Sequence, residues 1–160
     1  MENWKNFVKI NEKENSPIEI GNSIVIDGHV DGKKNAIFTH FHSDHIQDFD
    51  LVTGSSYHKI LLHDITHEVM IALKNPRKFM KNIIPLPYDQ VHTTKFGETI
   101  TLLDADHIPG SCQVHVKIDN TRILYSGDFV FPSAATPKCD ILVLDANHGT
   151  PQFTTNTAIF

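Results

Sequence analysis

The segment from His40 to His45 has the sequence HFHSDH and carries four potential metal ligands within six residues. It directly follows residues 36–39, an apolar run that predicts a short buried strand. In an extended chain alternate side chains share one face, so His40 and His42 can reach the same metal ion. Imidazole and carboxylate groups are typical zinc ligands. The pattern therefore predicts a zinc site at a strand end, and the alternative is a histidine-rich surface loop.

The remaining ligands of this segment, Asp44 and His45, come after the alternating pair. The sequence predicts a small helix over residues 44–49. Where the extended chain turns into this helix, the side chains of Asp44 and His45 would be redirected toward a second metal position close to the first. The segment alone thus predicts ligands for two neighbouring metal positions.

Two further candidate ligands lie at predicted strand ends much later in the chain. His107 lies between a predicted strand over residues 99–105 and a Pro-Gly turn. Asp128 follows a predicted strand over residues 122–126 and Gly127, whose lack of a side chain permits a close approach of the backbone. Each of these residues alone would be an ordinary turn residue. With the HFHSDH segment, they extend one candidate ligand set.

Composition restricts the class of protein. The chain has 160 residues, enough for one compact domain. A hydrophobic fraction of 40% allows a packed core, and a formal net charge of -5 argues against a broadly basic nucleic-acid coat. No apolar run is long enough to span a membrane, and no secretory signal is visible. Because there are only two cysteines, a disulfide framework is excluded and we expect a cytoplasmic protein.

The order of predicted elements indicates one α/β domain built from many strands and a few helices. Residues 1–15 are polar and are expected to be a loosely ordered start, residues 16–153 form the domain, and residues 154–160 are a truncated end. Two early strands, over residues 18–20 and 23–27, are predicted to be joined by a hairpin turn. Apolar residues at helical spacing predict a helix over residues 65–74; they are Ile65, Val69, Ala72 and Leu73.

Taken in order, the candidate ligand segments resemble the successive metal motifs of the metallo-β-lactamase superfamily. The matching segments are HFHSDH at 40–45, HIPGS at 107–111 and SGD at 126–128. Asp27, which ends an early strand, resembles the first motif of that superfamily, a structural acid under the site. The resemblance covers residues 18–150. It implies the α/β metallo-β-lactamase fold, a layered αβ/βα sandwich, represented here by its N-terminal portion.

The resemblance also implies a ligand set for two zinc ions. His40, His42 and His107 would hold one ion, and Asp44 and His45 would hold the second. Asp128 would bridge the two ions. Asp44 would additionally orient the reacting hydroxide, so Asp44 and Asp128 are the implied catalytic residues.

Residues 141–151, with the sequence ILVLDANHGTP, are similar to the strand, acid and Thr-Tyr-Gly segment of the β-CASP nucleases. Asp145 matches the acid that supports the metal site in that branch, although Asn147 and His148 replace the Thr-Tyr pair. The other interpretation of Asp145 is a strand-end acid that caps a turn. The branch includes RNA 3′-end processing nucleases and DNA crosslink-repair nucleases. The sequence does not separate RNA from DNA as the substrate.

The implied activity is hydrolysis of a nucleic-acid phosphodiester by a hydroxide activated between two zinc ions. The final ligand histidine of the superfamily and the β-CASP cap domain both lie beyond the last motif. We therefore expect weak or absent activity for this chain alone. Two other functions stay open, namely hydrolysis of a small thioester, lactone or phosphodiester on the same fold, and an inactive truncated metal-binding scaffold.

Four cations lie close together at the end of the predicted helix and after it, and they are Lys74, Arg77, Lys78 and Lys81. They could contact the phosphate backbone of a nucleic acid. Positive charge also suits a helix C-terminus, so a solvated helix end is the alternative. Nucleic acid is thus the expected partner, no membrane partner is indicated, and the sequence gives no oligomeric state.

Overall fold

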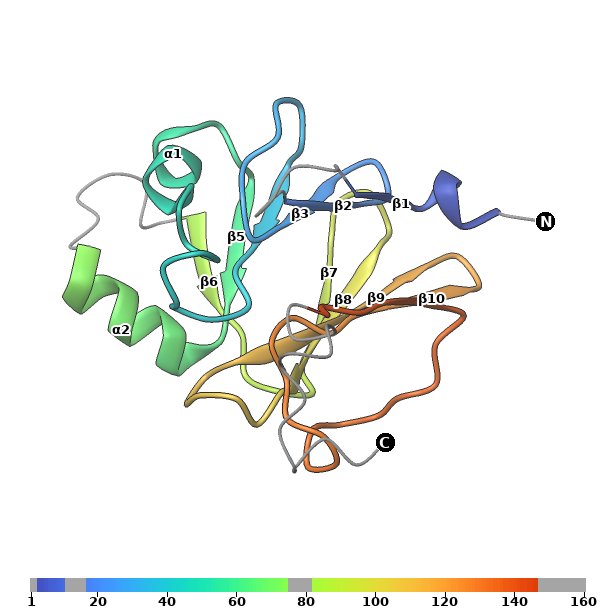
Figure 1. Ribbon diagram of the computed structural model, residues 1–160. Helices are drawn as coiled ribbons and strands as arrows, with labels where there is room; N and C mark the ends of the chain where they lie inside the picture. Colours follow the sequence, from blue (N-terminus) through green and yellow to red (C-terminus); the bar gives the residue numbers. More distant parts are fainter. Residues whose placement is uncertain (1–2, 11–16, 75–81, 147–160) are drawn as a thin grey trace.

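The computed structural model describes residues 3–10, 17–74 and 82–146, and the chain folds there into two facing β-sheets with helices against one of them (Figure 1). The helical segments are η1 (Asn3–Asn6), α1 (Phe49–Gly54) and α2 (Asp64–Lys74). The first sheet contains β1 (Val8–Ile10), β2 (Ile18–Ile20), β3 (Ile24–Ile26), β4 (Asn35–Ile37), β5 (Lys59–Leu62) and β6 (Ile83–Pro85). The second sheet contains β7 (Val91–Thr93), β8 (Thr99–Asp104), β9 (Cys112–Ile118), β10 (Thr121–Tyr125) and β11 (Ile141–Val143).

The first sheet changes from antiparallel to parallel pairing in its middle. Strands β1 to β3 pair antiparallel, and the predicted hairpin between β2 and β3 is confirmed, with Gly21 at φ +56° in its turn. Strands β3 to β6 then pair parallel to one another. Parallel strands need crossover connections, and α2 forms part of the one between β5 and β6. The carboxyl ends of β3, β4 and β5 consequently lie together at one edge, where ligand sites of open α/β sheets form.

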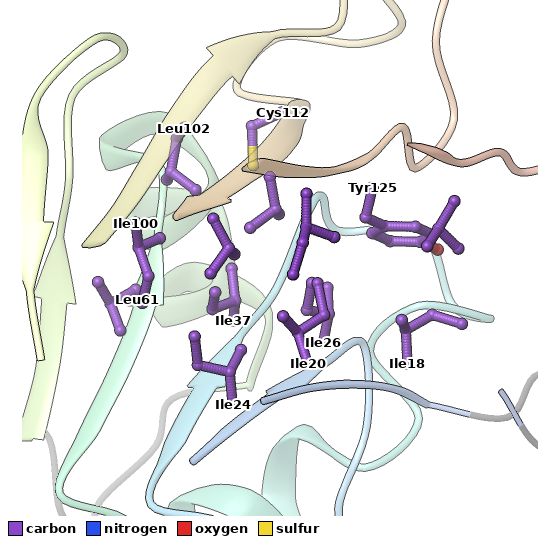
Figure 2. Close-up of a cluster of buried hydrophobic side chains, with 14 of the residues drawn as sticks. Ile18, Ile20, Ile24, Ile26, Ile37, Leu61, Ile100, Leu102, Cys112 and Tyr125 are labelled. Carbon is purple, nitrogen blue, oxygen red and sulfur yellow. The ribbon is translucent and has the colours of Figure 1, made fainter. Parts of the chain in front are cut away.

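The main core lies between the two sheets (Figure 2). Isoleucines at alternate positions of β2 and β3 point into it from the first sheet, together with Ile37 and Leu61. Side chains from β8, β9 and β10 meet them from the second sheet; Leu102, Cys112 and Tyr125 are examples. Because side chains alternate along a strand, the opposite face of the first sheet has its own apolar residues.

Those residues form a second core under the helices. Phe38 follows β4, and its ring meets the ring of Phe49 from α1 edge to face, with 5.2 Å between centroids. Met70 of α2 is buried in the same cluster. The described residues therefore form three layers, helices, first sheet and second sheet, which confirms the predicted α/β fold. They include no helix on the outer face of the second sheet, where the αβ/βα sandwich would have its fourth layer.

Two predicted elements differ from the structure. Within the start that was expected to be loosely ordered, residues 1–15, the segment 3–10 is ordered, because β1 pairs with β2 and Val8 is buried in the main core. The short helix predicted over residues 44–49 is wrong. Residues 43–48 form turns instead and the helix α1 begins at Phe49.

The helix predicted over residues 65–74 is confirmed as α2. Its buried positions are Thr66 and Met70, whereas Ile65 and Leu73 are exposed. None of the helices in the described segments is long and apolar enough to cross a membrane.

Candidate metal centre

The centre is built around the carboxyl end of β4, where Thr39 and His40 are both fully buried. The carboxylate of Asp27, at the end of β3, accepts hydrogen bonds from the backbone N–H of Thr39 at 2.8 Å and from its hydroxyl at 2.7 Å. Asp27 lies at φ +53°, a left-handed conformation that aspartate tolerates better than most residues. The acid therefore fixes the backbone from which the HFHSDH segment starts.

Four donor atoms converge beside this strand end, and they belong to His40, His42, His107 and Asp128. Nδ1 of His42 lies 3.0 Å from Nε2 of His40 and 3.3 Å from Nε2 of His107. A carboxylate oxygen of Asp128, Oδ2, lies 3.4 Å from Nε2 of His107 and 3.8 Å from Nε2 of His40. Four ligands at zinc–nitrogen distances of 2.0–2.1 Å form a tetrahedron with edges of about 3.3 Å. The observed separations fit a tetrahedral zinc site.

A second group of possible ligands shares Asp128 and adds His45 and Asp145. Oδ1 of Asp128 lies 3.5 Å from Nε2 of His45, while Oδ2 faces the first group. The two oxygens of Asp128 thus point to different groups, as a bridging carboxylate requires. Asp44 is half exposed, and its Oδ2 lies 3.6 Å from Nε2 of His45.

Hydrogen bonds select the ring nitrogen that each buried histidine presents. His45 donates from Nδ1 to Oδ2 of Asp27 at 2.8 Å. Nδ1 of His40 lies 3.1 Å from the hydroxyl oxygen of Thr39. Because that hydroxyl donates its own hydrogen to Asp27, His40 donates to it from Nδ1. Both rings consequently direct Nε2 toward the donor groups, an orientation that metal-binding histidines commonly obtain from such partners.

The electrostatics of the centre favour bound positive charge. Burial, together with the neighbouring His45, lowers the pKa of His40 to about 4, so this ring is neutral. Hydrogen bonding to His45 lowers the pKa of Asp128 to about 2. Burial alone would lower the pKa of His45, but hydrogen bonds to Asp128 and Asp27 raise it to about 10. The carboxylates of Asp27 and Asp128 therefore stabilise a protonated, positively charged His45. A divalent cation can take the place of that positive charge. In donor type, separation and charge, the residues fit zinc.

Close backbone packing brings Asp128 to the other ligands. Gly127 precedes it at φ +51°, and a Cβ atom built on that glycine would lie 3.3 Å from Cγ2 of Thr39. The carbonyl of Thr39 in turn accepts a hydrogen bond from the backbone N–H of Cys112 at 2.9 Å. The glycine before Asp128 thus lets β10 approach the end of β4, as expected from the sequence.

The structure brings most of the predicted site residues together. Five of the six predicted ligands belong to the two groups, and they are His40, His42, His45, His107 and Asp128. Asp44 belongs to neither group and lies beside His45. Asp145, predicted as a supporting acid, belongs to the second group, and Asp27 binds His45 from beneath. Asp145 also has its backbone N–H bonded to the hydroxyl of Ser126 at 2.9 Å. Of the four predicted nucleic-acid contacts, Lys74 is the last residue of α2, and Arg77, Lys78 and Lys81 lie outside the described residues. Asn147 and His148 also lie outside the described residues.

Thr39 is a site residue that the sequence reasoning missed. Its backbone N–H and its hydroxyl both bind Asp27, and its hydroxyl accepts from His40. The only signal in the sequence is that a residue able to donate and accept hydrogen bonds directly precedes the first ligand. Such a signal is weak, because threonine is also an ordinary strand residue.

Comparison with protein families places this centre in a known class. A model of the Metallo-beta-lactamase superfamily matches residues 25–146, which include every candidate ligand. The chain belongs to the metallo-β-lactamase superfamily. The family resemblance and the fold predicted from the sequence are both confirmed.

Curated relatives of this chain carry the names of DNA cross-link repair proteins and of a 5′ exonuclease. The chain is 34% identical over 138 residues to human DNA cross-link repair 1A protein, covering 79% of this chain and 12% of that protein. It is 29% identical over 136 residues to DNA cross-link repair protein SNM1 of Arabidopsis thaliana, covering 79% and 27%. It is 30% identical over 128 residues to the 5′ exonuclease Apollo of Gallus gallus, covering 75% and 27%. The chain therefore spans 12–27% of the length of these relatives.

A solved structure supports the fold. The chain matches a structure titled "Peroxy diiron species of chemotaxis sensor ODP" with a TM-score of 0.50 and 16% identity, covering 69% of this chain and 52% of that one. At that identity the match concerns the fold and carries nothing about substrate.

Proposed function

We propose that this chain carries the zinc centre of a hydrolase that cleaves nucleic-acid phosphodiester bonds, with DNA as the favoured substrate. The observation that supports the proposal most is the convergence of imidazole and carboxylate donors at separations suited to tetrahedral zinc. The names of the relatives, DNA cross-link repair proteins and a 5′ exonuclease, favour DNA over RNA. RNA processing is kept as the second substrate class to be tested.

In this proposal each ligand has a distinct place. His40, His42 and His107 would hold one zinc ion, while His45, Asp44 and Asp145 would be available to the second. Asp128, which belongs to both groups of possible ligands, would bridge the two ions. When bound, two such ions supply a water of lowered pKa and positive charge beside the phosphate oxygens.

The protein residues prepare this chemistry by orientation and charge. Asp27 keeps His45 turned so that Nε2 faces the centre. Thr39 does the same for His40. Asp44, whose carboxylate is half exposed, is the group best placed to accept a proton from an attacking water.

The chain spans only a small part of the length of its relatives. The activity, substrate and partners of the whole protein are therefore also part of what we propose. The relevant experiment measures zinc per purified chain by elemental analysis. It measures the shortening of labelled single-stranded DNA and RNA with a whole protein that contains this chain, because cleavage by the chain alone is expected to be weak or absent. We expect two zinc ions per chain and a loss of DNA cleavage in His42→Ala and Asp44→Ala. The exposed His58 provides a control, since His58→Ala should retain both properties.

Three results would contradict the proposal. Retained cleavage in both ligand variants would exclude the two-metal centre as the catalyst. Hydrolysis of a thioester or lactone, with no cleavage of either nucleic acid, would indicate a small-molecule hydrolase. Fewer than two zinc ions with no hydrolysis would indicate a metal-binding scaffold. The cytoplasmic location expected from composition stays a prediction, which fractionation of cells would test.

A further inference from the structure

Tyr88 lies outside the ligand motifs and is fixed between two parts of the fold. It follows β6, and its ring stacks on the ring of His63, which directly follows β5. The ring centroids are 3.8 Å apart and the planes differ by 23°. His63 is itself buried, and its Nδ1 accepts a hydrogen bond from the backbone N–H of Ile65 at 3.3 Å. The phenol of Tyr88 is therefore held in one direction by a buried partner.

The phenol group is directed at the loop that carries His107. Its hydroxyl donates a hydrogen bond to the carbonyl oxygen of Ser111 at 2.8 Å. Ser111 is fully buried, and its own hydroxyl oxygen accepts from the backbone N–H groups of His107 and Ile108, each at 3.1 Å. The N–H of Ser111 also bonds to the carbonyl of Ile108 at 2.8 Å. Ser111 thus closes the loop on itself and sets the backbone of His107.

A second hydrogen bond holds the loop to the helix α2. The hydroxyl of Thr66 in α2 donates to the carbonyl of Gly110 at 2.8 Å. Gly110 lies at φ +81°, and a Cβ atom there would lie 2.8 Å from the backbone nitrogen of Thr66. The loop is consequently held by both α2 and Tyr88, and α2 packs too closely against Gly110 for a side chain there.

We propose that Tyr88 is a positioning residue for the metal ligand His107, acting through Ser111 on the first ligand group alone. The second group, His45, Asp128 and Asp145, takes no donor atom from residues 107–111. The inference rests on the metal centre of the proposed function but requires neither nucleic acid nor turnover. Loss of an outer hydrogen-bond partner of a metal ligand lowers metal affinity by roughly 10- to 100-fold. Because Thr66 still holds the loop, we expect the lower end of that range.

The test is a zinc titration of the whole chain against a fluorescent chelator. We expect two binding steps in the unmodified protein. Tyr88→Phe removes only the phenol oxygen and keeps the ring stacked on His63, so it should weaken one step about tenfold. The other step should weaken much less, because the two groups share Asp128 but no other residue. Ser111→Ala breaks the next link of the same connection and should weaken the same step.

Tyr57 offers a matched control, because it is also a tyrosine whose hydroxyl donates to a backbone carbonyl, that of Val30 at 3.1 Å. The Tyr57 hydroxyl also accepts a hydrogen bond from the backbone N–H of Val30 at 3.2 Å and lies 3.0 Å from Nδ1 of His29. Tyr57→Phe should therefore lower the free energy of unfolding by at least as much as Tyr88→Phe and leave both zinc steps unchanged. This comparison separates positioning from general stability. Urea unfolding of each variant verifies that it is folded during the titration.

Two results would overturn the role of Tyr88 and leave the proposed function unaffected. Unchanged zinc steps in Tyr88→Phe would remove the positioning role, and equal weakening of both steps would show a general loss of structure. Should Tyr88→Phe fail to fold, Ser111→Ala decides by the same criteria. An unmodified chain that binds no zinc would overturn the metal centre as well, so failure of the two proposals can be told apart.

Discussion

Replacing Asp27 by alanine removes the acid that lies beneath both ligand groups. Its side chain is only 8% exposed and accepts three hydrogen bonds, two from Thr39 and one from His45. Removal leaves a buried backbone N–H, a buried hydroxyl and a charged imidazole without their acceptor. We expect Asp27→Ala to be among the most destabilising substitutions in this part of the chain.

The magnitude follows from those contacts. Each hydrogen bond to a charged acceptor contributes about 1.5–3 kcal/mol, but neighbouring bonds are not additive, so the carboxylate should account for about 4 kcal/mol. Removing one partner of a buried ion pair costs about 3–5 kcal/mol by itself, which agrees. Alanine at φ +53° adds about 1–2 kcal/mol of backbone strain. The expected total is about 5 kcal/mol for Asp27→Ala. It is about 2 kcal/mol for Asp27→Asn, which keeps the shape and one acceptor oxygen.

Asp119 is the control for the backbone contribution. It lies at φ +52° in the exposed turn between β9 and β10, so Asp119→Ala should cost only the strain, about 1–2 kcal/mol. The assay is urea unfolding of all three variants without added metal. If Asp27→Ala were no more destabilising than Asp119→Ala, the acid would not support the centre and the argument from its three contacts would fail.

Two more predictions follow from the same region. Gly110→Ala should lower the free energy of unfolding by about 3 kcal/mol through its clash with Thr66, whereas Gly32→Ala, at φ +86° with open space around it, should cost about 1 kcal/mol; equal costs in urea unfolding would contradict the close fit. Zinc binding at pH 7 should release a proton from His45, whose pKa is raised to about 10, and zinc affinity should rise with pH up to that value. Calorimetry in buffers of different ionisation enthalpy measures this release, and its absence would mean that His45 is not a ligand.

The sequence by itself determined the parts of the site that depend on local geometry. His40 and His42 are two residues apart on extended chain, so their convergence needs only the alternation of a strand. Gly127 before Asp128 and the hairpin at Gly21 likewise follow from backbone conformations that few residues adopt. The extent of α2 was predicted from helical spacing, a property of a short stretch of chain, although Ile65 and Leu73 of that pattern are exposed.

Contacts between distant residues were decided by the tertiary structure alone. The separation of Asp145 from His45, the bond of Tyr88 to Ser111 and the burial of Thr66 instead of Ile65 depend on how two sheets and a helix pack. The helix predicted over residues 44–49 failed for a related reason: the segment turns to bury His45 against Asp27 and Ile46 in the core. Local propensity is worth tenths of a kcal/mol per residue, and burial of a side chain and of a paired charge outweighs it.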